Sequence, residues 1–237
     1  MVQTNRNKKT QYYKAHKEIL VAIDCIIFGF SDNDLKVLLL KRDFEPAKGQ
    51  ISLIGGFVRQ EESLDNAAAR ILHELTGLKD IYLEQLYTYG SIDRDPGERV
   101  ISVAYCALLK IQDLDHEYVR MHSARWCPIS DCPELIFDHE TMIEKAIRRI
   151  QRRAKNRPIG FELLPEHFTI PQLQKLYEAI YQRKLDSRNF RKKLLAMNIL
   201  KKYDKKDKSS SKKGAYLYSF DKKKYNKLLK DGFHFDL

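Results

Sequence analysis

The sequence predicts a mixed α/β domain followed by a small helical domain that ends in a β-hairpin. Three observations lead to this fold class. Apolar and β-branched runs typical of strands recur up to residue 109, two amphipathic helical patterns accompany them, and the pattern changes after residue 160. From there, two capped helical patterns precede two short strand patterns that enclose a lysine- and serine-rich loop. With 237 residues and 43% apolar content, the chain is long enough for two packed domains.

The first domain opens with strand patterns. Residues 19–28 form an almost continuous apolar run typical of a strand buried on both faces, and residues 37–40 form a shorter one. The polar triplet Asp32, Asn33 and Asp34 predicts a hairpin turn between them. Further strands are expected at 57–59, 83–89 and 100–109, of which the last is rich in β-branched and aromatic residues.

Two helices complete this domain. Ser63 is a typical N-cap, apolar residues follow it at helical spacing to Leu75, and Gly77 provides the stop. A second amphipathic pattern covers residues 140–154. We therefore expect a basic flexible arm at 1–17, a sensing domain at 18–152 and a linker with Pro158 and Gly160 at 153–162.

The remaining segment, residues 163–237, predicts a winged helix-turn-helix. Thr169 can cap a helix that has Pro171 in its first turn, and Asp186 can cap a second helix. Strands at 199–203 and 215–220 would then flank the basic loop 204–214 as a wing.

Charge divides along the same boundary. Residues 1–150 carry 20 Lys and Arg against 23 Asp and Glu, whereas residues 151–237 carry 23 against 9, so the net charge of +11 comes from the last third. Within residues 18–150 the balance is 15 positive against 23 negative groups. A block this basic is typical of a nucleic-acid partner, and a solvated tail is the plain alternative.

The N-terminus has no secretory pattern, no apolar run is long enough to span a membrane, and the four cysteines contain no CxxC pair. We expect a cytoplasmic protein with no structural zinc.

The stretch from Gly55 to Leu78 resembles a Nudix box, the signature of diphosphate hydrolases. The matching positions are Gly56, Glu62, Arg70, Leu72, Glu74, Gly77 and Leu78. The resemblance implies an α/β/α sandwich with a mixed sheet, in which three helix carboxylates hold Mg²⁺. Here Ile71 and Leu75 stand at two of these positions beside Glu74, so we expect neither a metal site nor catalysis, and no cofactor. Glu62 and Arg70 are expected to pair and fix the loop to the helix.

A cleft without catalysis can still act as a receptor. Asp24 is a lone carboxylate in an apolar strand, and paired structural and ligand-contacting roles are both open for it. Charged groups beside an aromatic ring would suit a small polyol, although a surface salt-bridge cluster is equally compatible with most of them. The candidate ligand-binding residues are Asp24, Lys41, Gly55, Gly56, Phe57, Asp93 and Glu98.

The basic third offers a surface for double-stranded DNA. Arg and Asn in the first turns of the second helix are typical of base readers, and lysines in a wing are typical of phosphate contacts. Solvated helix and loop faces are the plain alternative. The candidate DNA-binding residues are Thr169, Ser187, Arg188, Asn189, Arg191, Lys192, Lys205, Lys206, Lys208, Lys212 and Lys213.

A Nudix-like domain joined to a winged helix resembles the Nudix-related transcription regulators, in which a degenerate hydrolase domain senses an effector. The segments IDCIIFGF, SLIGGFV, IDRDPGERV, PIGFELLP and LYEAIYQRKLDSRNFRKKL carry this resemblance, most closely to the arabinose-responsive branch. It implies a homodimeric repressor of pentose utilisation genes that binds palindromic operator DNA and is released by L-arabinose or another pentose. The alternatives are a regulator of NAD metabolism that senses ADP-ribose, a Nudix pyrophosphohydrolase acting on nucleoside-diphosphate derivatives, and a sensor that recruits another protein.

Overall fold

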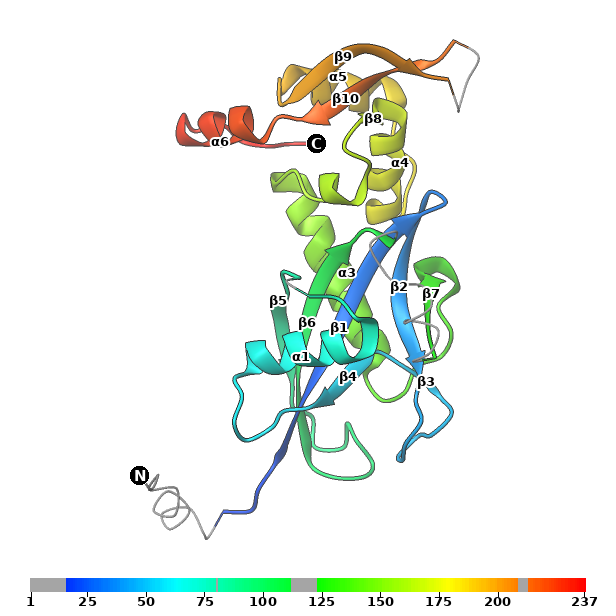
Figure 1. Cartoon of the computed structure of the whole chain (residues 1–237), viewed down its shortest axis with the longest axis vertical. Helices are drawn as coiled ribbons and strands as arrows, with labels where there is room; N and C mark the ends of the chain where they lie inside the picture. Colours follow the sequence, from blue (N-terminus) through cyan, green and yellow to red (C-terminus); the bar gives the residue numbers. More distant parts are fainter. Residues whose placement is uncertain (1–15, 80, 112–122, 209–212) are drawn as a thin grey trace.

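The computed structural model describes residues 16–79, 81–111, 123–208 and 213–237. The first domain contains a seven-stranded mixed sheet with main strand order β3-β2-β1-β6-β5 (Figure 1). Strands β1 (Leu20–Ser31) and β6 (Val100–Leu109) pair in parallel, and the other pairs are antiparallel. The remaining strands are β2 (Asp34–Lys41), β3 (Ile51–Ser52), β4 (Ile54–Phe57), β5 (Glu84–Tyr89) and β7 (Ala124–Pro128).

One helix covers each face of this sheet, so the predicted α/β/α sandwich is confirmed. Helix α1 (Leu64–Thr76) packs on residues such as Ile23 and Cys25 of β1, while α3 (His139–Asn156) packs on Ile26 and Phe28. Alternate residues of a strand point to opposite faces, and because both faces are covered, the run is apolar at nearly every position except Asp24. Short 3-10 turns at Ile129–Asp131 and Phe161–Leu163 complete the connections.

Local signals set the bounds of α1. The Ser63 hydroxyl accepts a hydrogen bond from the amide of Asn66, and Gly77 adopts φ 74°, a left-handed conformation that ends the helix at low steric cost. At the β1–β2 turn, Asp32 and Asn33 both have positive φ, as a tight hairpin requires.

The second domain has the predicted winged-helix order. Strand β8 (Phe168–Thr169) leads into α4 (Ile170–Tyr181) and α5 (Ser187–Ala196), and the wing is formed by β9 (Leu200–Asp207) and β10 (Ala215–Phe220). Helix α6 (Lys222–Lys230) follows. Strand β9 is longer than predicted, while β3, β7, β8 and α6 were not predicted at all. Strand β4 lies at 54–57 rather than at 57–59, because Gly55 lets the strand approach β1 closely and Gly56 leaves room for Ile71 of α1.

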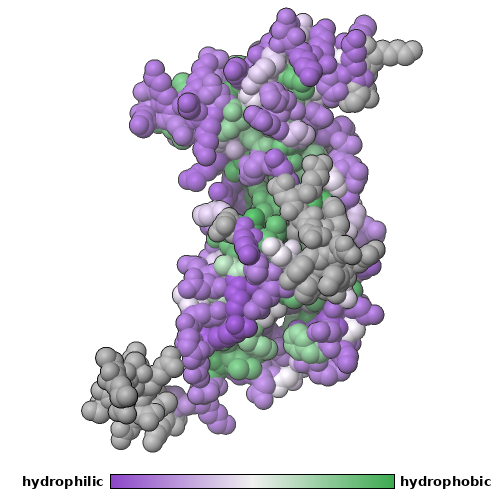
Figure 2. Space-filling model, viewed as in Figure 1, coloured by the Kyte–Doolittle hydropathy of each residue, from purple (hydrophilic) through white to green (hydrophobic). Residues whose placement is uncertain are grey.

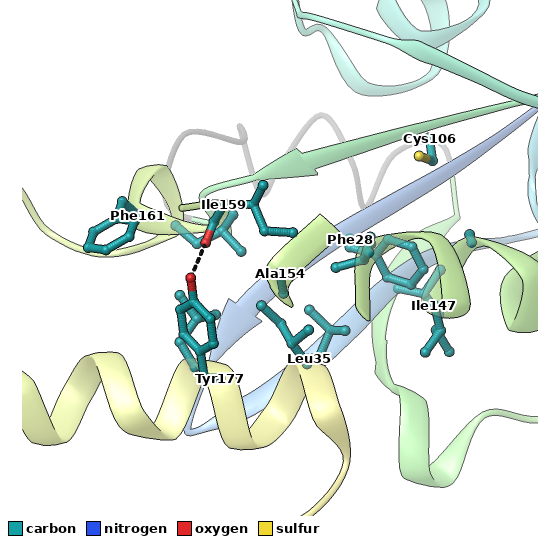
Figure 3. Packing of buried hydrophobic residues seen from close by; sticks show 14 of the residues in the cluster. Phe28, Leu35, Cys106, Ile147, Ala154, Ile159, Phe161 and Tyr177 are labelled. Atoms are coloured by element: carbon teal, nitrogen blue, oxygen red, sulfur yellow. Dashed lines mark hydrogen bonds between the residues drawn. The ribbon is translucent and has the colours of Figure 1, made fainter. Parts of the chain in front are cut away.

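The two domains share one hydrophobic core. Ala154 of α3, Ile159 and Phe161 are buried together with Tyr177 of α4, whose hydroxyl lies 3.5 Å from the carbonyl oxygen of Ile159 (Figure 3). The predicted linker at 153–162 begins inside α3, and its second half is packed at Ile159 and Gly160, whereas residues 155–157 are exposed. Within the described residues, no helix is both long and apolar enough to cross a membrane. The arm at 1–17 lies outside the described residues except for its last two positions.

Candidate functional site: a charged pocket and a basic helix surface

A pocket of about 230 Å³ opens where β1, β4 and the start of α3 meet. Five of the seven predicted ligand residues line it: Asp24, Lys41, Gly55, Gly56 and Phe57. Asp93 and Glu98 do not line it, although their neighbours Arg94 and Asp95 do. The lining residues that were not predicted include the charged and aromatic side chains of Arg42, Phe44, Arg94, Phe137 and His139.

A buried charge network forms the floor of the pocket. Asp24 is only 6% exposed, and one of its oxygens accepts a hydrogen bond of 2.5 Å from the Ser102 hydroxyl. The Arg94 guanidinium lies 3.6 Å from this carboxylate and donates hydrogen bonds of 2.7 and 3.1 Å to Asp138. Asp24 is thus a paired structural carboxylate. Gly55 is required beside it, because a Cβ there would lie 2.4 Å from an Asp24 oxygen.

His139 is buried at the first turn of α3 and faces the same network. Its Nδ1 accepts a hydrogen bond of 3.1 Å from the backbone amide of Leu53, so the neutral ring carries its proton on Nε2. That nitrogen lies 3.6 Å from Asp24 Oδ1. Burial lowers the pKa of His139 below 6.5 and outweighs the opposing effect of the Asp24 charge.

Cations and aromatic rings line the rest of the pocket. Phe44 and Phe57 are each 45% exposed, which is high for aromatic rings that touch a pocket. The Arg42 guanidinium stacks 3.7 Å from the centre of the Phe44 ring, and its Nε donates to the Phe44 carbonyl. Lys41 ends β2 and is exposed.

The Nudix-box helix holds its loop by charge pairing, as predicted. Arg70 donates two hydrogen bonds to Glu62, of 2.9 and 2.5 Å, and further ones to Glu74 and to the Phe57 carbonyl. The hydrogen bonds from Arg70, together with one from the Arg59 backbone amide, lower the pKa of Glu62 to about 2.

The residues at the expected Mg²⁺ positions do not fit a metal. Ile71 is 2% exposed and packs under Gly56, and Leu75 presents an apolar wall to the pocket. Glu74 is committed to Arg59 and Arg70. Among the described residues, no group of three His, Cys, Asp or Glu side chains is placed to hold a metal ion.

Helix α3 connects the pocket with the second domain. Its N-terminal residue His139 lines the pocket, and near its other end Gln151 donates a hydrogen bond of 3.0 Å to the carbonyl of Ile180 in α4. Arg149 and Arg153 both pair with Glu84 of β5 and fix the helix to the sheet. Helix α3 thus runs without a break from the pocket to the contact with α4.

The predicted DNA-binding residues lie mainly on α5 and the wing. Ser187, Arg188, Asn189, Arg191 and Lys192 are exposed on α5, as are Lys205 and Lys206 on β9 and Lys208 and Lys213 beside the loop. Lys212 lies outside the described residues.

Thr169 does not belong to this surface, and the prediction for it was wrong. The residue is 1% exposed, and its hydroxyl closes a capping box with Gln172 at the start of α4.

Comparison with known proteins identifies both domains. Residues 19–149 match the family model described as the NUDIX domain, and residues 160–220 match the NrtR DNA-binding winged helix domain. The chain is 29% identical over 221 residues to the "ADPR responsive transcriptional repressor NtrR" of Acinetobacter baylyi, covering 91% of this chain and 88% of the relative. It is 34% identical over 148 residues to an ADP-ribose pyrophosphatase of Methanocaldococcus jannaschii, covering 60% of this chain and 82% of that protein.

Solved structures give the same result. NrtR of Shewanella oneidensis in complex with a 27mer DNA is 30% identical, with a TM-score of 0.74 over 84% of this chain and 93% of that one. The NUDIX domain of the same protein in complex with ADP ribose is 36% identical, with a TM-score of 0.51 over 57% of this chain and 91% of that one.

Fold and site together define a degenerate Nudix domain joined to a winged helix. The NUDIX match covers more than half of the chain, and the chain therefore belongs to the Nudix family. Its second domain is a winged helix of the NrtR type. These relatives do not support the predicted arabinose branch; they favour the ADP-ribose alternative instead.

Proposed function

We propose that this protein is a transcriptional repressor that binds operator DNA and is released from it by ADP-ribose. The observation that carries the proposal is the pocket mouth, where Lys41 and Arg42 flank the exposed rings of Phe44 and Phe57. A neutral pentose gives such cations no charge to neutralise. A nucleoside diphosphate sugar has a diphosphate for the cations and a planar base for an aromatic ring.

The replacement of the metal-binding carboxylates by Ile71 and Leu75 also supports a diphosphate ligand that is held by side-chain cations. A bound diphosphate has to be neutralised, and Ile71 and Leu75 leave no carboxylate set that could recruit Mg²⁺ for this purpose. Side-chain cations are then the remaining source of positive charge. The same replacement argues against hydrolysis, so binding without turnover is the expected outcome.

The relatives independently support both ADP-ribose as the ligand and DNA as the partner. The Acinetobacter baylyi relative is described as ADPR responsive, and the Shewanella oneidensis relative has been solved with DNA and, as its NUDIX domain, with ADP ribose. We further propose that the protein acts as a homodimer that presents one winged helix to each half-site of the operator.

Ligand and operator binding would be coupled through α3. ADP-ribose in the pocket would contact Asp24 and Arg94, and Arg94 pairs with Asp138 at the N-terminus of α3. Gln151 would then pass a displacement of α3 to α4. Such coupling is typically about 1–3 kcal/mol, and operator DNA must weaken ADP-ribose binding by the same factor.

Calorimetric titration of ADP-ribose into the Lys41→Ala and Arg42→Ala variants tests the ligand half. We expect each variant to bind about 10–100-fold more weakly, because a charged hydrogen bond contributes about 1.5–3 kcal/mol. Lys48→Ala is the matched control, because this lysine belongs to the same connection but does not line the pocket. Unchanged affinity in both pocket variants would reject the assignment of ADP-ribose to this pocket.

Arg188→Ala and Arg191→Ala test the DNA half. We expect the loss of about 1–3 kcal/mol of discrimination between the operator and random DNA for each bidentate base contact removed. Arg148→Ala, which removes an exposed arginine from α3, should leave discrimination unchanged. Equal discrimination by all three variants and the native protein would show that α5 does not read the bases.

A further inference from the structure

Helix α6 is a strongly basic element outside the proposed DNA-binding surface of α5 and the wing. It begins directly after the wing and lies beyond residues 160–220, the part that matches the winged-helix family. Five of its nine residues are lysines: Lys222, Lys223, Lys224, Lys227 and Lys230.

The helix is held firmly against the winged-helix core. The Asp221 side chain caps it by accepting a hydrogen bond of 2.9 Å from the Lys224 amide, and the Asp221 amide donates to the carbonyl of Ile199, also at 2.9 Å. Tyr225 is buried and packs against Phe220 of β10 and against Phe233. Since Ile199 joins α5 to β9, the start of α6 is fixed to the end of the proposed recognition helix.

The lysines of α6 have no carboxylate partners within the described chain. Other lysines of this domain do: Lys193 pairs with Asp236, and Lys175 pairs with Glu178. In α6, positions such as Lys223 and Lys227 lie one turn apart, where like charges repel and destabilise an isolated helix. A polyanion along the exposed face would relieve this repulsion.

The position of α6 relative to the wing suggests which polyanion. In Figure 1, α6 and the loop ends of strands β9 and β10 lie on opposite sides of the winged-helix domain, with α5 between them, and Figure 2 shows hydrophilic side chains on both sides. We propose that α6 is a second phosphate-contacting element, which binds the DNA backbone that flanks the bases read by α5 on the side away from the wing. This inference rests on the proposed function.

The salt dependence of DNA binding in a variant with Lys223, Lys227 and Lys230 changed to Ala tests the proposal. Alanine favours helix, so the fold should persist, and thermal unfolding verifies this. Each lost phosphate contact lowers the slope of log K against log salt by about 0.9, so we expect a slope smaller by about 2–3. Affinities for operator and random DNA should fall together by about tenfold or more, because backbone contacts carry no sequence information.

A variant with Arg148, Arg152 and Lys155 changed to Ala is the matched control. It also removes three positive charges, from exposed positions of α3, and its slope of log K against log salt should equal that of the native protein. A native slope in the α6 variant, or an equal decrease in both variants, would overturn the proposal. This failure is distinguishable from failure of the proposed function, in which the native protein itself would not prefer its operator over random DNA.

Discussion

Arg94 is the residue whose loss should reveal the pocket network most clearly. Its side chain is 3% exposed, donates two hydrogen bonds to Asp138, and lies 3.6 Å from Asp24. In Arg94→Ala, the buried Asp24 carboxylate loses the positive charge of Arg94 and keeps the Ser102 hydroxyl and the His139 ring beside it. Breaking a buried ion pair from one side costs about 3–5 kcal/mol, since the remaining charge is left uncompensated.

Thermal unfolding at pH 7 measures this cost. For a chain of about this size, each kcal/mol lowers Tm by about 2–4 °C, so the Arg94→Ala variant should unfold about 6–20 °C below the native protein. Arg99→Ala is the control from the same loop. This arginine donates to the backbone carbonyls of Gly90 and Ser91, which carry no net charge, and we expect a loss of about 1 kcal/mol.

A second substitution identifies the cause of the destabilisation. Asp24→Asn in the Arg94→Ala background removes the uncompensated charge and should recover part of the lost stability, so the two changes would be less than additive. An Arg94→Ala variant that unfolds within about 2 °C of the native protein would refute this explanation. So would a double variant whose loss of stability equals the sum of the losses in the two single variants.

Three further outcomes follow from the same structure. Because burial lowers the pKa of His139, the unfolded chain takes up a proton that the folded chain does not as pH falls below 6.5. The free energy of unfolding should therefore fall by up to about 1.4 kcal/mol per pH unit below pH 6.5. In urea unfolding, the His139→Gln variant should lose less of this free energy per pH unit than the native protein, and an equal loss in both would contradict the prediction. Purified protein should not cleave nucleoside-diphosphate derivatives such as ADP-ribose with Mg²⁺ or Mn²⁺, as measured by chromatographic separation of the two phosphomonoester products, and steady turnover that Glu74→Gln abolishes would overturn this expectation. Gln151→Ala removes the hydrogen bond to Ile180, so anisotropy titrations should show native operator affinity without ligand but a smaller ADP-ribose effect; an unchanged effect would count against α3 as the connection.

Much of the fold was predictable because its signals are local. The cap at Ser63, the stop at Gly77 and the capping residue Asp186 each act through hydrogen bonds or conformations within one helical turn. Helix α6 was missed because five of its nine residues are lysines, which leaves little apolar periodicity in its sequence. Its buried residue Tyr225 packs against Phe220 and Phe233, which lie outside the helix. Strand β3 has only two residues, and the sequence of β7, ARWCP, has no regular apolar alternation; both strands are ordered by pairing with β2.

The site was predictable only where a motif marks it. Gly55, Gly56 and Phe57 adjoin the Nudix box, and Asp24 stands out as a charge in an apolar strand. His139 gave no signal, because its partner Leu53 is 86 positions away and only the sheet topology brings the two together. Arg42 was detectable in principle, since it follows Lys41 at the end of a strand that borders the pocket.

The most direct test of the account is a titration of ADP-ribose against the complex of the native protein with DNA from upstream of its own gene, at fixed salt. The account predicts that ADP-ribose dissociates the complex, that L-arabinose at equal concentration does not, and that DNA weakens ADP-ribose binding by the same factor. Release by L-arabinose alone, or an ADP-ribose affinity that is identical with and without operator DNA, would contradict it.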